Sequence, residues 1–243
     1  TAHYEIDLAG SGLEYTPGDS LAVQPTNDPQ LVADTLAALG FSGDEIVKHP
    51  KNGTEVPIRQ ALIEATLITE IDNKLIKAII EKTGGNTALN GLLEPEKKAE
   101  LKSYLWGRFV IDLLLENPTA KFEPQEFMLT QKKLNIRLYS ISSSQKAHPE
   151  EVHLTVATVR YTSHGRARGG RALRLQPLGR VHVVRDRLGH APEHQANAHA
   201  GGKQHGQPAA ARKVGLGILA ADAQLPQAAK RQVQHEQQRQ KHH

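Results

Sequence analysis

Apolar and polar residues alternate at both ends of the first 170 residues, which is the pattern of β-strands. Every second side chain of residues 3–8 is apolar, and this period of two predicts a half-buried strand. A Pro-Gly turn within 15–20 leads to a second short strand at 20–25, and we expect these two strands to run antiparallel. The alternation returns in 135–144 and 152–161, which predicts two more strands.

Between the strand-like segments, apolar residues recur at the spacing of helices. Asp28 and Asp72 precede two such segments as N-caps, and Gly40 and Gly84 end them. Three more helices are predicted, over 58–65, 94–107 and 108–116. Because each segment has one apolar stripe, the simplest interpretation of the stripes is a packed helical core, with no cofactor role for these side chains.

The order of these elements is strands, then helices, then strands again. That order indicates an α+β fold with an antiparallel sheet or barrel that is interrupted by helices. We expect residues 1–26 and 117–170 to form the β-barrel, and residues 27–116 to form a helical insertion within it.

Composition and charge change abruptly after residue 170. Before that point there are 18 Lys+Arg and 22 Asp+Glu residues, and after it 12 and 4, so the net charge of +4 hides an acidic region and a basic one. All ten aromatic residues lie before the change, and eight of the 13 histidines lie after it. With little apolar surface to offset the entropy of ordering, residues 171–243 are expected to be a disordered, low-complexity tail.

The composition also excludes several classes of protein. The absence of cysteine rules out disulfides, thiol catalysis and cysteine-bound zinc, and it fits a reducing compartment, so a cytoplasmic location is expected. No apolar run approaches the roughly 20 residues that span a bilayer, and the N-terminal residues lack the apolar core of a signal peptide. A first residue other than methionine favours a chain that begins within a longer protein.

The stretch RLYSISSS, residues 137–144, has many polar groups for a strand. Arg137 offers a planar fork of donors for phosphate, Tyr139 a flat ring for stacking, and the serines small donors and acceptors. Together these groups suit a planar, phosphate-bearing cofactor. On composition alone, however, an edge strand with solvated serines is the favoured explanation.

Four segments in series resemble the NADPH-dependent diflavin reductases. RLYSISSS is similar to their Arg-x-Tyr-Ser flavin motif, and YTPGDSLAVQPTND to their Pro-Gly-Asp turn and following strand. YLWGRFVIDLL is similar to their connecting segment, and VHLTVATVRYTSHGRARGG to their next strand and basic loop. The likeness covers residues 1–170 and is greatest to the branch of the family that serves sulfite reductase. It implies a ferredoxin reductase-like fold, in which an antiparallel Greek-key barrel, incomplete in this chain, holds FAD and carries an inserted helical connecting domain.

The resemblance implies a cofactor-binding role for the strand that contains RLYS. Tyr139 would stack on the isoalloxazine ring of FAD, Arg137 would meet the FAD phosphates, and Ser140 would hydrogen-bond near the reactive N5 of the flavin. Leu138 belongs to the same motif. No catalytic side chain and no metal ligand are implied.

Other matched positions lie on the following strand and elsewhere in the chain. Thr155, Val156 and Ala157 match strand positions that contact the flavin mainly through backbone, and Tyr161 matches an aromatic near the adenine half. The remaining candidate cofactor-binding residues are Thr66, Trp106 and Gly170.

The family resemblance also implies a chain of electron transfer and its partners. NADPH would pass a hydride to FAD, and electrons would leave singly through an FMN domain to a haem or iron-sulfur partner. The protein itself would orient FAD and tune its potential. In the parent system FMN and NADPH are also used, but their sites are expected to be absent from this chain, and neither a membrane nor nucleic acid is an expected partner.

The chain departs from the family pattern at GRARGG, residues 165–170. Family members continue with Gly-Val-x-Ser/Thr, whose backbone donors and hydroxyl hold the pyrophosphate at a helix start, whereas this chain continues with Arg171 and Ala172. One hypothesis is that residues 171–243 are translated out of frame, which sequencing the encoding DNA would test, and a natural disordered tail is its rival. In either case we expect weak FAD binding and no complete NADPH-driven turnover by this chain alone.

Other functional classes are also weighed. A noncatalytic helical interaction scaffold fits if no flavin binds, and the basic tail could bind nucleic acid nonspecifically, although it has no aromatic residues for stacking. A hydrolase built on Ser140 and His153 is disfavoured because there is no nucleophile elbow. The spaced tail histidines are His190, His194, His199 and His205. They lie among Ala, Gly and Gln without a second shell, so solvated histidines are favoured over a metal site.

Overall fold

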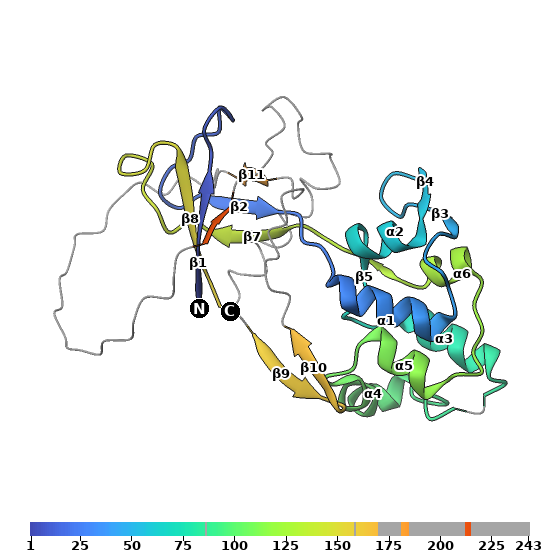
Figure 1. The fold of residues 1–243 in the computed structure, drawn as a ribbon. Coiled ribbons are helices and arrows are strands. Elements are labelled where there is room, and N and C mark those ends of the chain that lie inside the picture. The colour runs from blue at the N-terminus through green and yellow to red at the C-terminus, as the bar shows by residue number, and fades with distance from the viewer. Residues whose placement is uncertain (86, 158, 170–180, 185–211, 215–243) are drawn as a thin grey trace. The chain divides into compact units, whose positions relative to one another are not determined.

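The structure is a computed structural model of the chain, drawn in Figure 1. It describes residues 1–85, 87–157, 159–169, 181–184 and 212–214. Within these residues, no helix combines the length and the apolar character needed to cross a membrane.

The chain divides into two compact units, each of which is described by itself. The first, here called the sheet unit, comprises Thr1–Gln24, Ile136–Thr158 and Leu175–His243. The second, the helical unit, comprises Pro25–Asn135 and Val159–Arg174. The units therefore change at positions 24 and 135, where the sequence placed the junctions at 26 and 116.

The first sheet of the sheet unit is built around β1 (Ala2–Asp7). This strand pairs antiparallel with β8 (Glu151–Val156) and parallel with β12 (Arg212–Val214). The alternating apolar side chains of β1 and β8 are buried, as the period of two predicted, and they are Tyr4, Ile6, Val152, Leu154 and Val156. The expected strand over 152–161 ends at Val156, because the chain passes there towards the helical unit.

The second sheet of the sheet unit has β2 (Ser20–Val23) at its centre. It pairs antiparallel with β7 (Arg137–Ser140) and with β11 (Val181–Val184). The sequence-based expectation that β1 and β2 are antiparallel neighbours is wrong, because the two strands belong to different sheets. Tyr15 lies in the segment that connects β1 to β2. Its hydroxyl donates a hydrogen bond to the Glu151 carbonyl of β8 at 2.9 Å, which fixes this segment to β8.

Two features of the sheet unit correct the predicted architecture. The described strands form two three-stranded sheets and do not close into a barrel. Furthermore, β11 and β12 fall in the region expected to be disordered, where backbone pairing with β2 and β1 places them in strands. The expectation of disorder therefore does not hold for these two segments.

The helical unit contains the segments that the helical spacing predicted. It also contains a helix over residues 124–129, in a stretch that the sequence assigned to the barrel. Its helices are α1 (Pro29–Leu39), α2 (Ile58–Glu64), α3 (Asn73–Lys82), the 3-10 turn η1 (Pro95–Lys97), α4 (Lys98–Leu105), α5 (Val110–Glu116) and α6 (Pro124–Leu129). Asp28 and Asp72 cap α1 and α3 by accepting hydrogen bonds from backbone amides, and Gly40 ends α1 in the left-handed conformation. Their apolar stripes, including Val32, Leu36, Leu75 and Ile79, pack into one core.

Two expected helices are shorter than the sequence suggested. The segment 94–107 begins as a 3-10 turn and its α-helix ends at Leu105, which leaves Trp106 beyond the last helical residue. The helix expected from 108 begins at Val110, because the Asp112 carboxylate accepts the backbone amide of Phe109 at 2.7 Å and fixes the helix start there.

The helical unit also contains strand pairs that the sequence patterns missed. A hairpin joins β3 (Ile46–Lys48) to β4 (Glu55–Pro57), and β5 (Thr66–Leu67) pairs with β6 (Lys132–Lys133). These strands have two or three residues, which is too short for a period of two to be recognised.

Another hairpin of the helical unit is formed by β9 (Arg160–Ser163) and β10 (Arg166–Gly169). Two contacts fix it to the helices. The Arg168 guanidinium meets the Asp112 carboxylate at 2.6 Å with both side chains buried, and Arg166 meets Asp34 at 2.8 Å. The hairpin is thereby held to α5 and α1 of its own unit.

Candidate cofactor-binding site

The strand β7 places the RLYS motif directly beside β2. Tyr139 is the register partner of Leu21 and Arg137 is the partner of Val23, both of which are buried residues of β2. Arg137, Leu138 and Tyr139 are themselves half-buried, whereas Ser140 is exposed. The motif is therefore held by a buried strand while its polar groups remain only partly covered.

Arg137 and Tyr139 are the two groups of the motif whose environment is unusual. The Nε atom of Arg137 is buried and has no hydrogen-bond partner among the described residues. Burial raises the pKa of the Tyr139 hydroxyl, although the charge of nearby Arg137 acts in the opposite direction. Burying a donor without a hydrogen-bond partner costs free energy, and an acceptor that bound the Nε of Arg137 would recover this cost. The Nε of Arg137 is therefore able to bind an acceptor.

The later serines of RLYSISSS have structural roles. Ser143 accepts a hydrogen bond from the backbone amide of His153 at 2.9 Å and shares another with the Tyr15 hydroxyl at 2.7 Å. The backbone amide of Ser142 donates to the His153 carbonyl at 2.9 Å. Ser142 and Ser143 therefore connect the end of β7 to β8. The explanation favoured on composition alone, an edge strand with solvated serines, does not apply to these two residues.

The candidates on β8 lie next to this connection. The Thr155 hydroxyl, which is exposed, donates to the Ser142 hydroxyl at 3.4 Å. Val156 is buried and Ala157 is exposed just beyond the strand end. The structure thus brings the end of β7 and the end of β8 together within the sheet unit, which is where seven of the predicted cofactor residues are.

Other candidates belong to the helical unit and differ in exposure. Thr66 is completely buried, and its hydroxyl lies 3.4 Å from the carbonyls of Ala61 and Leu62, so it is engaged inside the unit. Trp106 and Tyr161 are exposed, by 78% and 42% respectively. Gly170 and the tail histidines named above lie outside the described residues.

Trp106 and the β9–β10 hairpin are physically linked. The Trp106 carbonyl lies 3.0 Å from the Nε2 atom of His164, in the turn of the hairpin. Next to it, Gly107 adopts a φ of +73°, and a Cβ at this position would lie 2.2 Å from the Ser163 hydroxyl. The exposed aromatics Trp106 and Tyr161 are therefore carried by two segments in direct contact.

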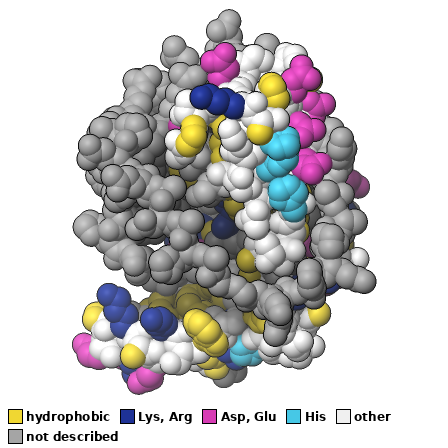
Figure 2. All heavy atoms as spheres, turned by 90° about the vertical axis from the view of Figure 1, so that its left-hand side faces the viewer, with side chains coloured by type: hydrophobic (Ala, Val, Ile, Leu, Met, Phe, Trp, Pro, Cys, Tyr) yellow, Lys and Arg dark blue, Asp and Glu magenta, His cyan; other side chains and the backbone are white. Residues whose placement is uncertain are grey.

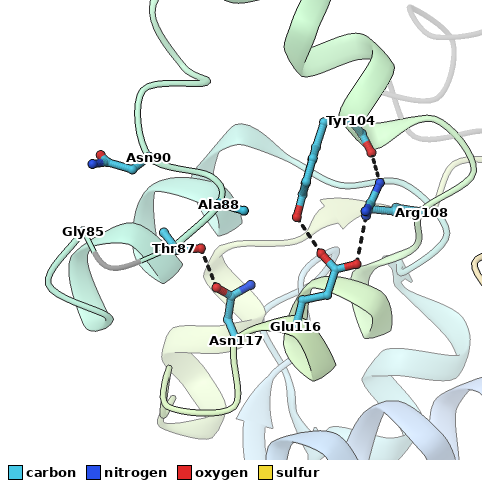
Figure 3. Close-up of a pocket in the computed structure, with 8 residues that line it drawn as sticks. All are labelled: Gly85, Thr87, Ala88, Asn90, Tyr104, Arg108, Glu116 and Asn117. Carbon is cyan, nitrogen blue, oxygen red and sulfur yellow. Dashed lines mark hydrogen bonds and ion pairs between the residues drawn. The ribbon is translucent and has the colours of Figure 1, made fainter.

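A pocket of about 600 Å³ in the helical unit is a rival location for a ligand (Figure 3). Its lining residues are Gly85, Thr87, Ala88, Asn90, Tyr104, Arg108, Glu116 and Asn117. The Tyr104 hydroxyl donates to Glu116 at 2.5 Å, and the Arg108 Nε donates to the same carboxylate at 3.0 Å. Burial and the hydrogen bond to Glu116 raise the pKa of Tyr104 to about 12.

The polar groups of this pocket are paired with one another. Besides the Glu116 contacts, the Thr87 hydroxyl donates to the Asn117 side chain at 2.5 Å, and the Arg108 guanidinium lies over the Tyr104 ring. The predicted cofactor-binding residues do not line the pocket. The polar side chains that line the pocket therefore form hydrogen bonds mainly with one another, as in a structural network. In contrast, the Nε of Arg137 on β7 has no partner among the described residues.

Arg168 was not identified as important from the sequence. It is 3% exposed, its charge is neutralised by Asp112, and its guanidinium carbon lies 4.5 Å from the centre of the Phe109 ring. Its position in a run of basic residues, GRARGG, resembled a solvated loop. No sequence signal distinguishes Arg168 from Arg166, because the two lie two residues apart on β10 and share one face. They differ in the carboxylates that they meet, buried Asp112 for Arg168 and partly exposed Asp34 for Arg166.

Comparison with known proteins places the chain in a family. The profile of the family described as FAD binding domain matches residues 1–173. The chain belongs to this family of flavoprotein domains, which confirms the resemblance seen in its motifs and implies the ferredoxin reductase-like fold.

Relatives in several bacteria are flavoprotein components of a reductase. The chain is 43% identical over 182 residues to the sulfite reductase (NADPH) flavoprotein alpha-component of Bacillus subtilis strain 168, over 73% of this chain and 30% of the relative. It is 38% identical over 170 residues to the protein of the same name from Zymomonas mobilis, over 70% of this chain and 27% of the relative. The chain thus matches less than a third of the length of these curated relatives.

The residues of β7 fit the cofactor of this family. On one short strand, Arg137 offers a buried donor that has no partner within the part of the chain that the structure describes, Tyr139 a half-buried ring, and Ser140 an exposed hydroxyl. Phosphate groups and a planar heteroaromatic ring are the ligand features that these three side chains complement.

Proposed function

We propose that the chain binds FAD along β7 and the end of β8, as the flavin-holding part of a sulfite reductase-like, NADPH-dependent flavoprotein. The observation that carries this proposal is the buried Nε of Arg137, unpaired among the described residues and beside the half-buried Tyr139. Within a family of FAD-binding domains, an unused donor on the motif strand is best explained as a group reserved for a cofactor phosphate.

Each residue has a distinct part in the proposed site. Arg137 binds a phosphate oxygen, Tyr139 covers one face of the isoalloxazine ring, and Ser140 offers its exposed hydroxyl to the ring edge. Leu138 and Val156 supply apolar surface, while Thr155 and Ala157 present backbone groups near the strand end. Bound FAD supplies the capacity to accept a hydride and to release electrons singly.

The candidate residues of the helical unit are proposed to contribute in different ways, because they differ in exposure. Trp106 and Tyr161 present exposed aromatic surface suited to stacking on the adenine half. Thr66 is buried with its hydroxyl engaged, so its part is to support the strand pair β5–β6 unless the cofactor reaches its backbone. Gly170, which lies outside the described residues, stays a candidate cofactor-binding residue.

The wider reaction belongs to the same proposal. Electrons from NADPH would pass through FAD and FMN to a haem or iron-sulfur partner, as the family resemblance implies. The names of the relatives support the NADPH and flavoprotein parts of this route. A Greek-key barrel that is incomplete in this chain, with residues 27–116 as its connecting insertion and residues 171–243 as an added tail, is a further part of it. So is a cytoplasmic location. Neither nucleic acid nor a membrane is a proposed partner.

A flavin titration of the full chain tests the proposal. We expect saturable quenching of flavin fluorescence, and we expect Tyr139→Ala to weaken the affinity tenfold or more, which corresponds to about 1.4 kcal/mol. Tyr139→Phe is the matched control, because it keeps the ring and removes only the hydroxyl, so its affinity should stay within about threefold, or about 0.7 kcal/mol.

Two results would overturn the proposal at different levels. If a cooperatively folded chain causes no quenching at all, the chain does not bind FAD. If quenching is saturable but Tyr139→Ala binds as tightly as the unchanged chain, FAD binds elsewhere and β7 is not its site. Circular dichroism of each variant distinguishes both results from loss of the fold.

A further inference from the structure

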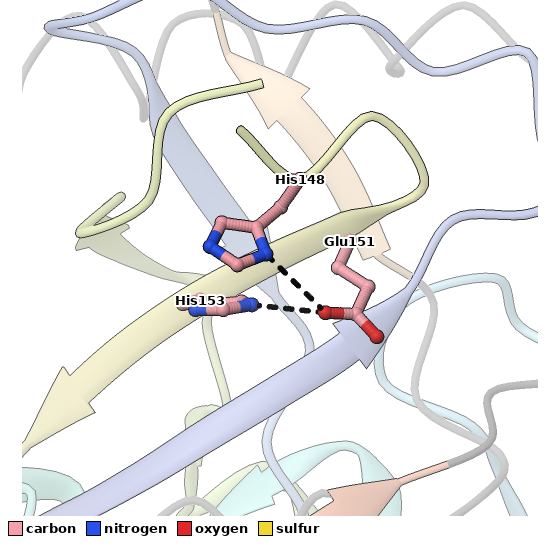
Figure 4. Close-up of side chains that lie close together, drawn as sticks. All are labelled: His148, Glu151 and His153. Carbon is pink, nitrogen blue, oxygen red and sulfur yellow. Dashed lines mark hydrogen bonds and ion pairs between the residues drawn. The ribbon is translucent and has the colours of Figure 1, made fainter. Parts of the chain in front are cut away.

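Three side chains with metal-ligating atoms converge at the start of β8 (Figure 4). They are His148, Glu151 and His153, and their ligand atoms all lie within 4.8 Å of one another. One carboxylate oxygen of Glu151 lies 3.1 Å from Nε2 of His153 and 3.8 Å from Nδ1 of His148. The two imidazole rings are 4.4 Å apart between centroids. Two imidazoles thus face a single carboxylate oxygen.

Local backbone structure explains why these side chains meet. The backbone amide of Glu151 donates to the His148 carbonyl at 3.4 Å, which closes a turn and brings these two residues together. Glu151 and His153 then lie two residues apart on β8, so they share one face of the strand. The sequence HPEEVH, residues 148–153, therefore encodes a turn followed by a strand with all three groups on one side.

The backbone that carries the cluster is fixed before any ligand arrives. The Glu151 carbonyl accepts from the Tyr15 hydroxyl at 2.9 Å. His153 is held at both backbone groups, because its amide donates to Ser143 at 2.9 Å and its carbonyl accepts from the amide of Ser142 at 2.9 Å. Binding an ion would therefore require movement of side chains but no ordering of the backbone, which favours affinity.

The neighbouring strand β1 adds negative charge around the cluster. In the register of the two strands, Glu5 lies opposite His153 and Asp7 lies opposite Glu151. The ring of His3 packs edge-on against His153 with 5.1 Å between centroids, and its Nε2 lies 3.8 Å from Glu5. Figure 2 shows histidine side chains beside a row of acidic ones on one face. Carboxylates beside a metal-binding imidazole orient it and raise its basicity.

We propose that His148, Glu151 and His153 form a binding site for a divalent first-row transition metal ion, with Zn²⁺ as the best-suited member. Two imidazoles and one carboxylate are a donor set for such ions, with metal–ligand distances of roughly 2.0–2.2 Å and a fourth position left to water. The site is accessible, because the side chains of His148, Glu151 and His153 are 46%, 34% and 12% exposed.

The metal site is independent of the proposed flavin function. None of its three residues is among those proposed to contact FAD, and the cluster is held by contacts within the sheet unit. The sequence interpretation found no metal site, because it examined the histidines of the tail and regarded His153 only as a poor partner for Ser140. The turn that brings His148 to Glu151 is not visible in strand periodicity.

The test is a titration of the flavin-free full chain with Co²⁺ and with Zn²⁺. Co²⁺ reports its ligands through visible absorption, and Zn²⁺ should displace it. We expect one site whose Co²⁺ spectrum indicates imidazole and carboxylate ligands, and a rise in the thermal transition of the sheet unit with Zn²⁺. His148→Ala and Glu151→Gln should each weaken this site at least tenfold.

The chain offers two matched controls. His49→Ala removes a half-buried histidine of the helical unit. Replacement of His190, His194, His199 and His205 by alanine removes spaced histidines of the tail. Both should keep the spectrum, the stoichiometry and the thermal shift. The proposal is overturned if the tail variant abolishes binding, if His148→Ala and Glu151→Gln bind like the unchanged chain, or if Zn²⁺ leaves the thermal transition unmoved.

Discussion

The two units differ in how each uses a buried arginine. In the helical unit, Arg168 meets Asp112 at 2.6 Å and lies against the Phe109 ring, so its charge is neutralised inside the fold. In the sheet unit, Arg137 lies on the cofactor motif. Each arginine leaves its Nε unpaired among the described residues, but an ion pair with a carboxylate is seen only for Arg168 there. The comparison teaches that Arg168 has a carboxylate partner inside the fold, whereas for Arg137, among the described residues, no such partner is seen, and Arg137 is the arginine that we propose for a ligand.

The largest expected effect comes from removing each arginine in turn. Arg168→Met should lower the free energy of unfolding by about 3–5 kcal/mol, because it leaves the Asp112 carboxylate buried without its partner. Arg137→Met should change it by less than about 1 kcal/mol, because Arg137 forms no ion pair with any residue that the structure describes. Urea unfolding followed by circular dichroism measures both, and the single tryptophan, Trp106, reports on the helical unit.

The same pair of variants separates structure from binding. Arg137→Met should weaken FAD binding at least tenfold, or about 1.4 kcal/mol, while the fold is retained. Equal losses of stability in the two variants would contradict the distinction, since Arg137 would then be as structural as Arg168.

A smaller effect tests the contact between the α4–α5 connection and the β9–β10 hairpin. Gly107→Ala combines a left-handed φ of +73° with a Cβ only 2.2 Å from the Ser163 hydroxyl, so we expect a loss of about 2–4 kcal/mol. Gly165→Ala is the matched control, because its φ is +68° but a Cβ there meets nothing within 4 Å. It should lose only the strain, about 1–2 kcal/mol.

The difference between the two alanine variants measures the close approach itself. Adding Ser163→Gly to Gly107→Ala should recover most of that difference, and thermal unfolding of the three proteins provides the comparison. If Gly107→Ala and Gly165→Ala are equally stable, the segment that carries Trp106 is not pressed against the hairpin.

The smallest expected effect concerns a surface ion pair of the helical unit. Lys82 meets Glu126 at 2.8 Å, and its hydrogen bond holds the pKa of Glu126 below the ordinary value of 4.5. Lys82→Met removes the ion pair together with the ammonium group that lies 5.1 Å from the centre of the Phe122 ring, and it should lose about 0.2–1 kcal/mol at pH 7.

The sign of the pH dependence follows from the lowered pKa. The contribution of the Lys82–Glu126 pair is present above pH 4.5 and is lost as the pH falls through the lowered pKa of Glu126. The stability curves of Lys82→Met and the unchanged chain should therefore converge in acid, and also at high salt. A difference that is independent of pH would mean that lost packing is its cause.

Much of the helical unit could be predicted from local patterns. The caps Asp28 and Asp72 and the apolar stripes of α1 and α3 are short-range features, and each is found where the spacing placed it. The strands β1 and β8 were found for the same reason, because alternating burial is recorded in every second residue. The family resemblance, carried by four motifs, was confirmed by the match to residues 1–173.

Strand pairing and side-chain meetings could not be predicted in this way. The sequence suggested that β1 pairs with β2, but pairing depends on contacts between residues far apart in the chain, and β1 pairs with β8 instead. The contact of Ser143 could not be predicted either. The sequence suggested a solvated serine, but its hydroxyl accepts a hydrogen bond from the backbone amide of His153. The contacts of the predicted cofactor residues with FAD remain predictions.

The sequence by itself determined the local elements, the family and the strand on which the cofactor motif lies, because these depend on neighbouring residues and on motif spacing. The tertiary structure decided which charged groups meet inside the fold, as Arg168 and Asp112 do, and which donors find no partner among the described residues, as for the Nε of each of the two arginines. The physical reason is that burial and hydrogen bonding depend on the partners that folding brings together, and those partners are distant in sequence.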